Sequence, residues 1–172
     1  MKDYALNIYE ATLQTECTND AATVLHDPVM QVVDLLRMAA TGGGKVIFIG
    51  NGGSLAACSH MANDLCLAGV TAMALDGVVN MACLANDLSF DDVFSRQFCW
   101  FSKPGDVLVA LSCSGKSKNV LASVKVARRN GNPVVTLSGF AHDNPLRQLG
   151  NVNFYTSSNS YGVVQLVQEA VL

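Results

Sequence analysis

Three serines and a glycine within six residues are the strongest chemical signal in the sequence. They form the segment Ser112-Cys-Ser-Gly-Lys-Ser117, which follows an apolar run and precedes a helical pattern. Serine hydroxyls donate hydrogen bonds, Gly115 lets the backbone approach a ligand, and the start of a helix adds unpaired N–H groups with a partial positive charge. These features predict a phosphate site, to which Lys116 adds charge. The alternative is that Ser117 only caps its helix and the rest is a polar turn.

A second glycine-rich loop, Gly50-Asn-Gly-Gly-Ser54, also lies between an apolar run and a helical pattern. It lacks the spaced third glycine of a dinucleotide fingerprint, and the serine loop lacks the spacing of a Walker loop. On the helix that follows it, His60 and Asp64 are four residues apart and share a face. Such a pair suits a divalent metal such as zinc, or acid–base chemistry. An ordinary surface pair is the alternative.

Two further polar residues, Asn86 and Asp87, are expected at the mouth of the sheet. There they are suited to bind the hydroxyls of a sugar. As an alternative, Asp87 or Ser89 only caps the helix that begins near Phe90.

The elements that must position these loops alternate along the chain. Short apolar runs predict strands at 45–50, 70–75, 106–112, 133–138 and 152–156. Helical spacing predicts helices at 5–27, 28–40, 55–67, 78–85, 90–101, 117–130 and 161–172. Alternating strands and helices indicate an α/β fold: a three-layer α-β-α sandwich around a five-stranded parallel sheet. Ligands of such sheets bind beyond the carboxyl ends of the strands, where both glycine-rich loops lie.

The chain divides at the glycine triplet that precedes the first predicted strand. We expect residues 1–41 to form an N-terminal helical arm and residues 42–172 to form a single phosphosugar-binding domain. The last helical pattern reaches Leu172 without a cap or a breaker, so we expect that helix to be incomplete.

Composition narrows the classes of function. Of the 172 residues, half are hydrophobic and the net charge is −3, without a basic cluster, so we expect no direct binding to nucleic acid. No apolar run is long enough to span a bilayer, and we expect no membrane partner. The six cysteines form no CxxC pair and residues 1–10 do not resemble a secretory signal, which predicts free thiols and a cytoplasmic location.

The motifs in this order resemble the sugar isomerase (SIS) domain, a flavodoxin-like fold, and most closely the sedoheptulose-7-phosphate isomerase (phosphoheptose isomerase) family. The resemblance covers nearly the whole chain. The segments that carry it are Gly-Asn-Gly-Gly-Ser (50–54) with His60, Leu-Ala-Asn-Asp (84–87), Val-Phe-Ser-Arg-Gln (93–97), Gly-Asp-Val-Leu (105–108), Ser-Cys-Ser-Gly-Lys-Ser (112–117) and Gln168-Glu169.

This resemblance implies an aldose–ketose isomerase that converts sedoheptulose 7-phosphate to D-glycero-D-manno-heptose 7-phosphate through an enediol(ate). It implies a homotetramer with sites at the subunit interfaces, one zinc ion per subunit, and a role in supplying heptose for lipopolysaccharide or capsule. Asp64 is implied as the catalytic residue, and His60, Asp64 and Gln168 as metal ligands. The positions implied to bind the sugar phosphate are Asn51, Gly52, Gly53, Ser54, Asp64, Asn86, Asp87, Ser112, Cys113, Ser114, Ser117 and Gln168.

Three positions depart from the family pattern. The family acid on the His60 helix is Glu, whereas this chain has Asp64, which is one methylene shorter. The catalytic and metal-binding His of the family would fall eight residues after Gln168, beyond Leu172. The usual Thr and Asn of the phosphate loop are replaced by Cys113 and Lys116.

Two other functions stay open. One SIS relative, DiaA, lacks the catalytic acid and binds the replication initiator DnaA, so the changed acid at 64 leaves a non-catalytic role possible. The other is an isomerase or sensor for a different phosphosugar, because the sequence does not report the size of the pocket.

Overall fold

The apolar runs of the sequence form the strands of one six-stranded sheet in the computed structural model, which describes residues 2–172. The strand order is β1-β6-β5-β4-β2-β3, in which β1 is antiparallel to β6 and all other neighbours are parallel. The strands are β1 (Glu16–Asn19), β2 (Val46–Ile49), β3 (Ala72–Ala74), β4 (Val107–Ser112), β5 (Val134–Gly139) and β6 (Val152–Thr156). The predicted parallel sheet of five strands is confirmed, with one antiparallel edge strand added.

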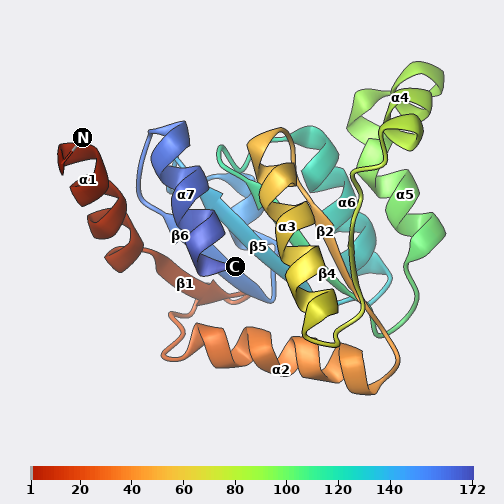
Figure 1. Ribbon diagram of the computed structural model, residues 1–172, viewed down its shortest axis with the longest axis horizontal. Helices are drawn as coiled ribbons and strands as arrows, with labels where there is room; N and C mark the ends of the chain where they lie inside the picture. Colours follow the sequence, from red (N-terminus) through yellow and green to blue (C-terminus); the bar gives the residue numbers. More distant parts are fainter. Residues whose placement is uncertain (1) are drawn as a thin grey trace.

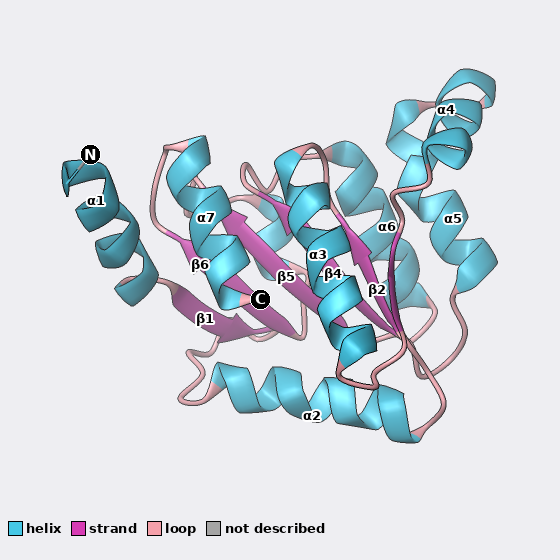
Figure 2. Cartoon of the chain, viewed as in Figure 1, coloured by secondary structure: helices cyan, strands magenta, loops and turns pink. Residues whose placement is uncertain are grey.

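Helices cover both faces of this sheet (Figures 1 and 2). The α-helices are α1 (Lys2–Leu13), α2 (Pro28–Thr41), α3 (Gly53–Leu67), α4 (Val78–Asp87), α5 (Val93–Phe101), α6 (Lys118–Arg129) and α7 (Tyr161–Val171). Two 3₁₀ turns, η1 (Phe90–Asp92) and η2 (Pro145–Gln148), complete the chain. Helices α2, α3 and α7 lie on one face, and α5 and α6 lie on the other. Across residues 2–172, no helix has the length and apolar character needed to cross a membrane.

Burial on both faces explains why the central strands read as continuous apolar runs. Val46 and Phe48 of β2 join the hydrophobic core beneath α2 and α3, whereas Ile47 and Ile49 join the core beneath α5 and α6. Every residue of β2, β4 and β5 is buried. Successive side chains of a strand point to opposite faces, so a strand covered on both sides is apolar at most positions, and a buried polar residue such as Thr136 is hydrogen-bonded.

The prediction of one helix over residues 5–27 is wrong. Helix α1 ends at Leu13, and Glu16–Asn19 becomes the edge strand β1, paired with β6. Tertiary contacts favour the strand: the Arg147 guanidinium binds the Glu16 carboxylate at 2.6 Å, and the Asn153 amide donates to the carbonyl of Thr18 at 3.3 Å. Such partners, more than 130 residues away in the chain, leave no trace in local periodicity.

The next helix forms as predicted. It begins at Pro28, and the Asp27 side chain accepts a hydrogen bond from the Met30 N–H at 3.1 Å. A proline in the first turn after an aspartate cap is a common helix start. Helix α1 lies beside α7 (Figure 1), and β1 belongs to the sheet, so residues 2–41 contribute to the same fold as the rest. The proposed division at residue 41 stays a prediction.

A buried carboxylate connects the amino ends of two central strands, which lie opposite the glycine-rich loops. The Asp106 side chain is fully buried and accepts hydrogen bonds from Lys45 Nζ at 2.7 Å, from the Lys45 N–H at 2.9 Å and from the Lys103 N–H at 2.8 Å. These bonds join the residues that precede β2 and β4. They hold the two strands in register from their amino ends, which in turn sets where the loops at their carboxyl ends meet.

We therefore expect Asp106→Ala to lower the free energy of unfolding by about 3–5 kcal/mol, because it leaves a partly buried ammonium group and two N–H groups without their acceptor. The matched control is Asp34→Ala, which removes an exposed ion pair with Arg37 at 3.7 Å and is expected to cost less than about 1 kcal/mol. Urea unfolding of both variants measures the difference. Equal effects would show that the Asp106 cluster does not brace the sheet.

Candidate functional site

A polar pocket of about 310 Å³ lies at the carboxyl ends of β2 and β4, where helices α3 and α6 begin. Eight of its lining residues come from the two glycine-rich loops, and two come from the start of α7. The lining residues are Asn51, Gly52, Gly53, Ser54, Ser112, Cys113, Ser114, Ser117, Tyr161 and Gln165. The structure thus brings together the two loops that the sequence singled out.

The serine loop turns tightly between β4 and α6. Gly115 has a φ of +62°, a conformation that favours glycine, and the Asn144 side chain packs where a Cβ would stand. The Gly115 N–H donates to the Ser112 carbonyl at 2.9 Å, which closes the turn. The Ser112 hydroxyl donates to the Ser117 hydroxyl at 3.0 Å, so these two groups already lie together in the pocket.

Ser117 precedes α6, but its side chain makes no capping hydrogen bond to the N–H groups of that helix, residues 118–129. The alternative that Ser117 serves only as a cap is therefore wrong. The N–H groups in the first turn of a helix have no partner within the helix, and the helix dipole places partial positive charge there. The hydroxyls and the start of α6 together form an arrangement that suits a phosphoryl group.

The glycine turn after β2 forms the opposite wall. Gly53 lies directly against the Gln165 side chain of α7, and a Cβ at this position would overlap the amide. The Asn51 side chain does not face the pocket freely: its amide exchanges two hydrogen bonds with the amide of Asn119, at 3.0 and 2.9 Å. The predicted role of Asn51 in binding the sugar must therefore use its backbone or the remaining hydrogen-bonding capacity of the amide.

A thiol forms part of the pocket lining. Cys113 is buried, with its sulfur 3.7 Å from the Ser54 hydroxyl and 3.6 Å from Oε1 of Gln168. Burial raises the pKa of the Cys113 thiol above its usual value, so the group stays uncharged at neutral pH. A neutral thiol adds no repulsion toward an anion in the pocket.

Gln168 lies behind this thiol and does not line the pocket. Its side chain is buried, and its Nε2 group has no hydrogen-bond partner among the described residues. A buried amide without a partner is uncommon, because leaving it unpaired costs free energy. The residue is therefore next to the predicted site, but its carbonyl oxygen faces Cys113 rather than His60.

His60 and Asp64 lie farther along α3 than the pocket. The His60 Nε2 atom is 3.5 Å from an Asp64 carboxylate oxygen, and its Nδ1 atom is 3.8 Å from a Glu169 carboxylate oxygen of α7. Gly53, His60 and Asp64 are spaced i, i+7 and i+11, which places them on one face of the helix. That face is turned to α7, where Gln165 meets Gly53 and Glu169 meets His60.

The predicted metal ligands do not converge on one point. His60 and Asp64 offer one nitrogen donor and one carboxylate, while Gln168 points elsewhere. Within residues 2–172, no three His, Cys, Asp or Glu side chains are grouped as a metal site requires. A catalytic zinc takes three protein ligands, so two donors do not fit it. Zinc binding stays a prediction, and no step of the chemistry below depends on it.

Asn86 and Asp87 also lie outside the pocket. Both are exposed at the end of α4, where the Asn86 amide donates to the Asp87 carboxylate at 2.8 Å and the Cys83 thiol approaches it at 3.2 Å. The hydrogen bond from Asn86 lowers the pKa of Asp87, with the Cys83 thiol adding to the effect. Their predicted role in sugar binding is not supported by a contact with the pocket in a single chain.

Tyr161 and Gln165 of α7 line the pocket but were not predicted as site residues, and Glu169 was noted only within the motif Gln168-Glu169, without a role. They are spaced four apart on α7, so they share a face of that helix. This spacing is the signal that was available. It became meaningful only when the fold placed that face against Gly53 and His60.

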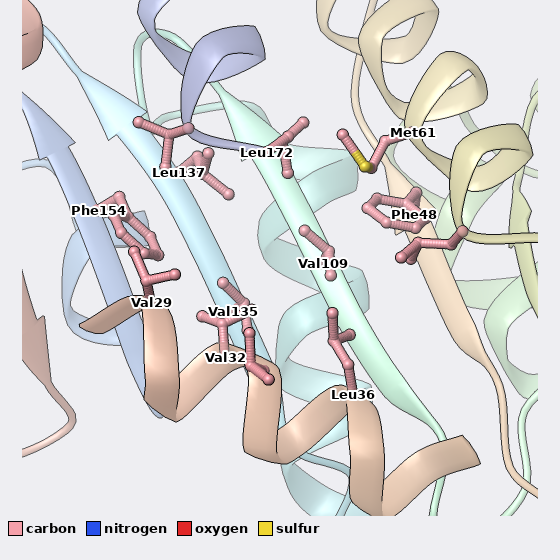
Figure 3. A pocket seen from close by; sticks show the side chains of 13 residues that line it. Val29, Val32, Leu36, Phe48, Met61, Val109, Val135, Leu137, Phe154 and Leu172 are labelled. Carbon is pink, nitrogen blue, oxygen red and sulfur yellow. The ribbon is translucent and has the colours of Figure 1, made fainter. Parts of the chain in front are cut away.

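A second cavity lies between α2, α3, α7 and the sheet, and Figure 3 shows its side chains. Val29, Val32 and Leu36 of α2 face Val109 and Val135 of the strands across it. All of its lining side chains are apolar. It contains no side-chain hydrogen-bond donor for hydroxyl or phosphoryl oxygens, so it is unsuited to a sugar phosphate.

The comparisons with known proteins agree on one family. Residues 9–139 match the family model described as "SIS domain". Curated proteins named phosphoheptose isomerase include those of Escherichia coli O7:K1 (38% identical over 117 residues), Rhodospirillum rubrum (40% over 118) and Thiobacillus denitrificans (35% over 146). These matches cover 64%, 64% and 81% of this chain, and 61%, 63% and 73% of the relatives. The chain therefore spans less than two thirds of the first two relatives.

Solved structures agree with this family. Phosphoheptose isomerase GmhA from Neisseria gonorrhoeae superposes with a TM-score of 0.83 at 27% identity, covering 99% of this chain and 92% of that one. A phosphoheptose isomerase from Francisella tularensis gives a TM-score of 0.84 at 24% identity, covering 99% and 90%, and supports the fold alone.

The environment of the thiols leads to a direct test of the pocket geometry. We expect iodoacetamide at pH 8 to modify the exposed Cys66 and Cys99 at least about tenfold faster than Cys113 and Cys58. Burial raises the pKa of the Cys113 thiol and raises that of Cys58 to about 12, so neither forms much of the reactive thiolate at this pH. Peptide mass spectrometry over time measures each rate. Labelling of Cys113 as fast as Cys66 would contradict its buried position.

Proposed function

The chain belongs to the SIS domain family, and from this premise we propose that it isomerises a phosphorylated sugar, converting sedoheptulose 7-phosphate to D-glycero-D-manno-heptose 7-phosphate. The observation that carries the proposal is the pocket in which the serine loop and the start of α6 face the glycine turn. The relatives named phosphoheptose isomerase support this choice of substrate.

The pocket suits the phosphoryl end of such a substrate. None of its lining residues is charged, so it presents neutral hydroxyls and helix-start N–H groups without a carboxylate that would repel an anion. Binding at this end is remote from the reacting carbons and supplies energy for positioning them.

Acid–base groups lie where the other end of an elongated sugar reaches. His60 is seven residues after Gly53 on the same face of α3, which corresponds to roughly 10 Å along the helix axis. A substrate with its phosphoryl group in the pocket and its carbon chain along the α3–α7 face directs its reacting carbons toward His60 and Asp64. The length of a seven-carbon sugar favours this placement.

In this proposal Asp64 moves the proton. As a base it takes the proton from C1 of the ketose while an acid protonates the carbonyl oxygen at C2, which gives the enediol(ate). The O1 hydroxyl then loses its proton as Asp64 returns a proton to C2. His60 lies between Asp64 and Glu169, and it is suited to exchange a proton with the oxygens. The aldose product then has its carbonyl at C1.

A second candidate is a phosphosugar-binding protein without catalysis, of the type of DiaA, which binds DnaA. The observation that favours it is that the acids Asp64 and Asp87, together with Asn86, lie outside the pocket in a single chain, and residue 64 carries the shorter acid. This candidate predicts binding of the sugar phosphate without turnover, and capture of the protein by purified DnaA.

The predicted homotetramer stays a prediction. Large apolar side chains are exposed on α1, including Leu6, Tyr9 and Leu13, and on α4, including Val78 and Val79. Helices α1 and α4 lie at opposite ends of the molecule (Figure 1), so a closed assembly that covers both would use two different surfaces.

The serine loop gives the first functional prediction. We expect Ser112→Ala with Ser114→Ala to raise the KM for sedoheptulose 7-phosphate at least about tenfold, because two hydroxyls facing the phosphoryl group are lost. The melting temperature should change little. Ser102→Ala, after α5 and outside the pocket, is the control and should leave the KM unchanged. A large loss of thermal stability with unchanged binding would show that the serines are structural.

The second functional prediction concerns Asp64, the acid on α3. We expect Asp64→Asn to lower kcat about a hundredfold or more, and Asp64→Glu to raise it, because the longer acid extends toward the substrate. Asp64 is half exposed, so neither change should alter stability measurably. Coupled assays of heptose 7-phosphate formation measure both rates, with Asp34→Asn on α2 as the control. If the wild-type protein binds the sugar phosphate but shows no turnover, the non-catalytic candidate is favoured.

A further inference from the structure

Two side-chain amides connect the opposite walls of the pocket. Asn51 belongs to the glycine turn after β2, and Asn119 is the second residue of α6 after β4. The Asn51 Nδ2 group donates to Oδ1 of Asn119 at 3.0 Å, and the Asn119 Nδ2 group donates to Oδ1 of Asn51 at 2.9 Å. The pair joins residues that are 68 positions apart in the chain.

Asn119 is held firmly on its own side of this pair. Its side chain is 2% exposed, and its Oδ1 atom also accepts the Val120 N–H at 2.9 Å. That bond satisfies one of the helix-start N–H groups from within α6. With two bonds at its oxygen and one from its nitrogen, the Asn119 amide has a single defined orientation.

Asn51 is the partner that meets the pocket. It lines the cavity, whereas Asn119 does not, so Asn119 acts on a ligand indirectly, through Asn51 or through the Val120 N–H at the start of α6. The turn that Asn51 begins is otherwise built on glycines: Gly52 has a φ of +55°, and Gly53 carries no side chain that could anchor it. The amide pair thus connects this turn to the start of α6 through two hydrogen bonds, beside the longer contact of 3.7 Å between the Ser54 hydroxyl and the Cys113 sulfur.

We propose that Asn119 is a positioning residue, which keeps the Gly52–Gly53 turn at the correct separation from the serine loop through its reciprocal amide pair with Asn51. The inference rests on the proposed function only in that the pocket receives a phosphorylated sugar.

The chemistry of the pair fits this role. Two side chains that exchange a pair of hydrogen bonds each need a donor atom and a separate acceptor atom; the Asn amide has them on Nδ2 and Oδ1, whereas a hydroxyl carries both functions on one oxygen. An aspartate at either position would replace a donor with a second acceptor and would bring negative charge close to the phosphoryl group. An amide pair connects the walls and leaves the site neutral.

The test is a double-mutant cycle on Asn51→Ala and Asn119→Ala. We expect each single change to raise the KM for sedoheptulose 7-phosphate about tenfold, with kcat altered less than about twofold, because the phosphoryl end is held less well while the reacting end is unchanged. The dissociation constant of inorganic phosphate, measured by calorimetry, should rise by a similar factor. The double variant should be no worse than the weaker-binding single variant, since the same pair is broken in each.

Asn132→Ala is the matched control for loss of a buried amide. Asn132 is also buried and donates to the carbonyls of Lys103 and Asp106, both at 2.9 Å. It precedes β5, however, and so lies at the amino ends of the strands, away from the pocket. We expect it to lower the melting temperature at least as much as Asn119→Ala and to leave the KM and the phosphate affinity unchanged.

Three outcomes would overturn the proposal. One is that Asn119→Ala binds sugar phosphate and inorganic phosphate as the wild-type protein does. Another is that the effects of the two single changes multiply in the double variant, and the third is that Asn132→Ala weakens binding equally. Each of these leaves the proposed isomerase intact. If the wild-type protein binds neither ligand, the proposed function and the positioning role both fail.

Discussion

Strands β2 and β4 pair in parallel, so the helices that follow them begin close together at the carboxyl ends of the strands. Ile49 lies opposite Ala110, and each strand then passes through a glycine-containing loop into a helix. This constraint brings two helix starts and three serine hydroxyls of the serine loop to one place without any charged side chain. The pocket depends on that parallel pairing.

The fold also separates the proposed phosphate site from the groups that can exchange protons. The pocket is neutral, whereas His60, Asp64 and Glu169 lie farther along the α3–α7 face. A carboxylate next to the phosphoryl group would repel it, and a proton-transfer group near it would be far from the carbonyl. The loops after β2 and β4 offer a surface for one end of a long substrate, and the contact between α3 and α7 offers a surface for the other.

Predictions from local sequence pattern were reliable for those elements whose own residues carry the pattern. The buried strands, the proline start of α2 and the serine loop were all predicted at or within a few residues of their observed positions. Local pattern failed at Glu16–Asn19, where a strand depends on pairing with β6 and on Arg147. It also assigned no role to Gln165 or Glu169, because nothing within α7 indicates which of its faces meets α3.

The sequence by itself determined the α/β class, the two loops of the pocket and the identity of the acid at position 64, since each follows from residue type and short-range spacing. The tertiary structure alone decided that Asn51 pairs with Asn119, that Gln168 faces Cys113, and that Asn86 and Asp87 lie away from the pocket in a single chain. The physical reason is distance along the chain: hydrogen bonds between residues 55 to 68 positions apart exist only after the sheet has set the register of its strands.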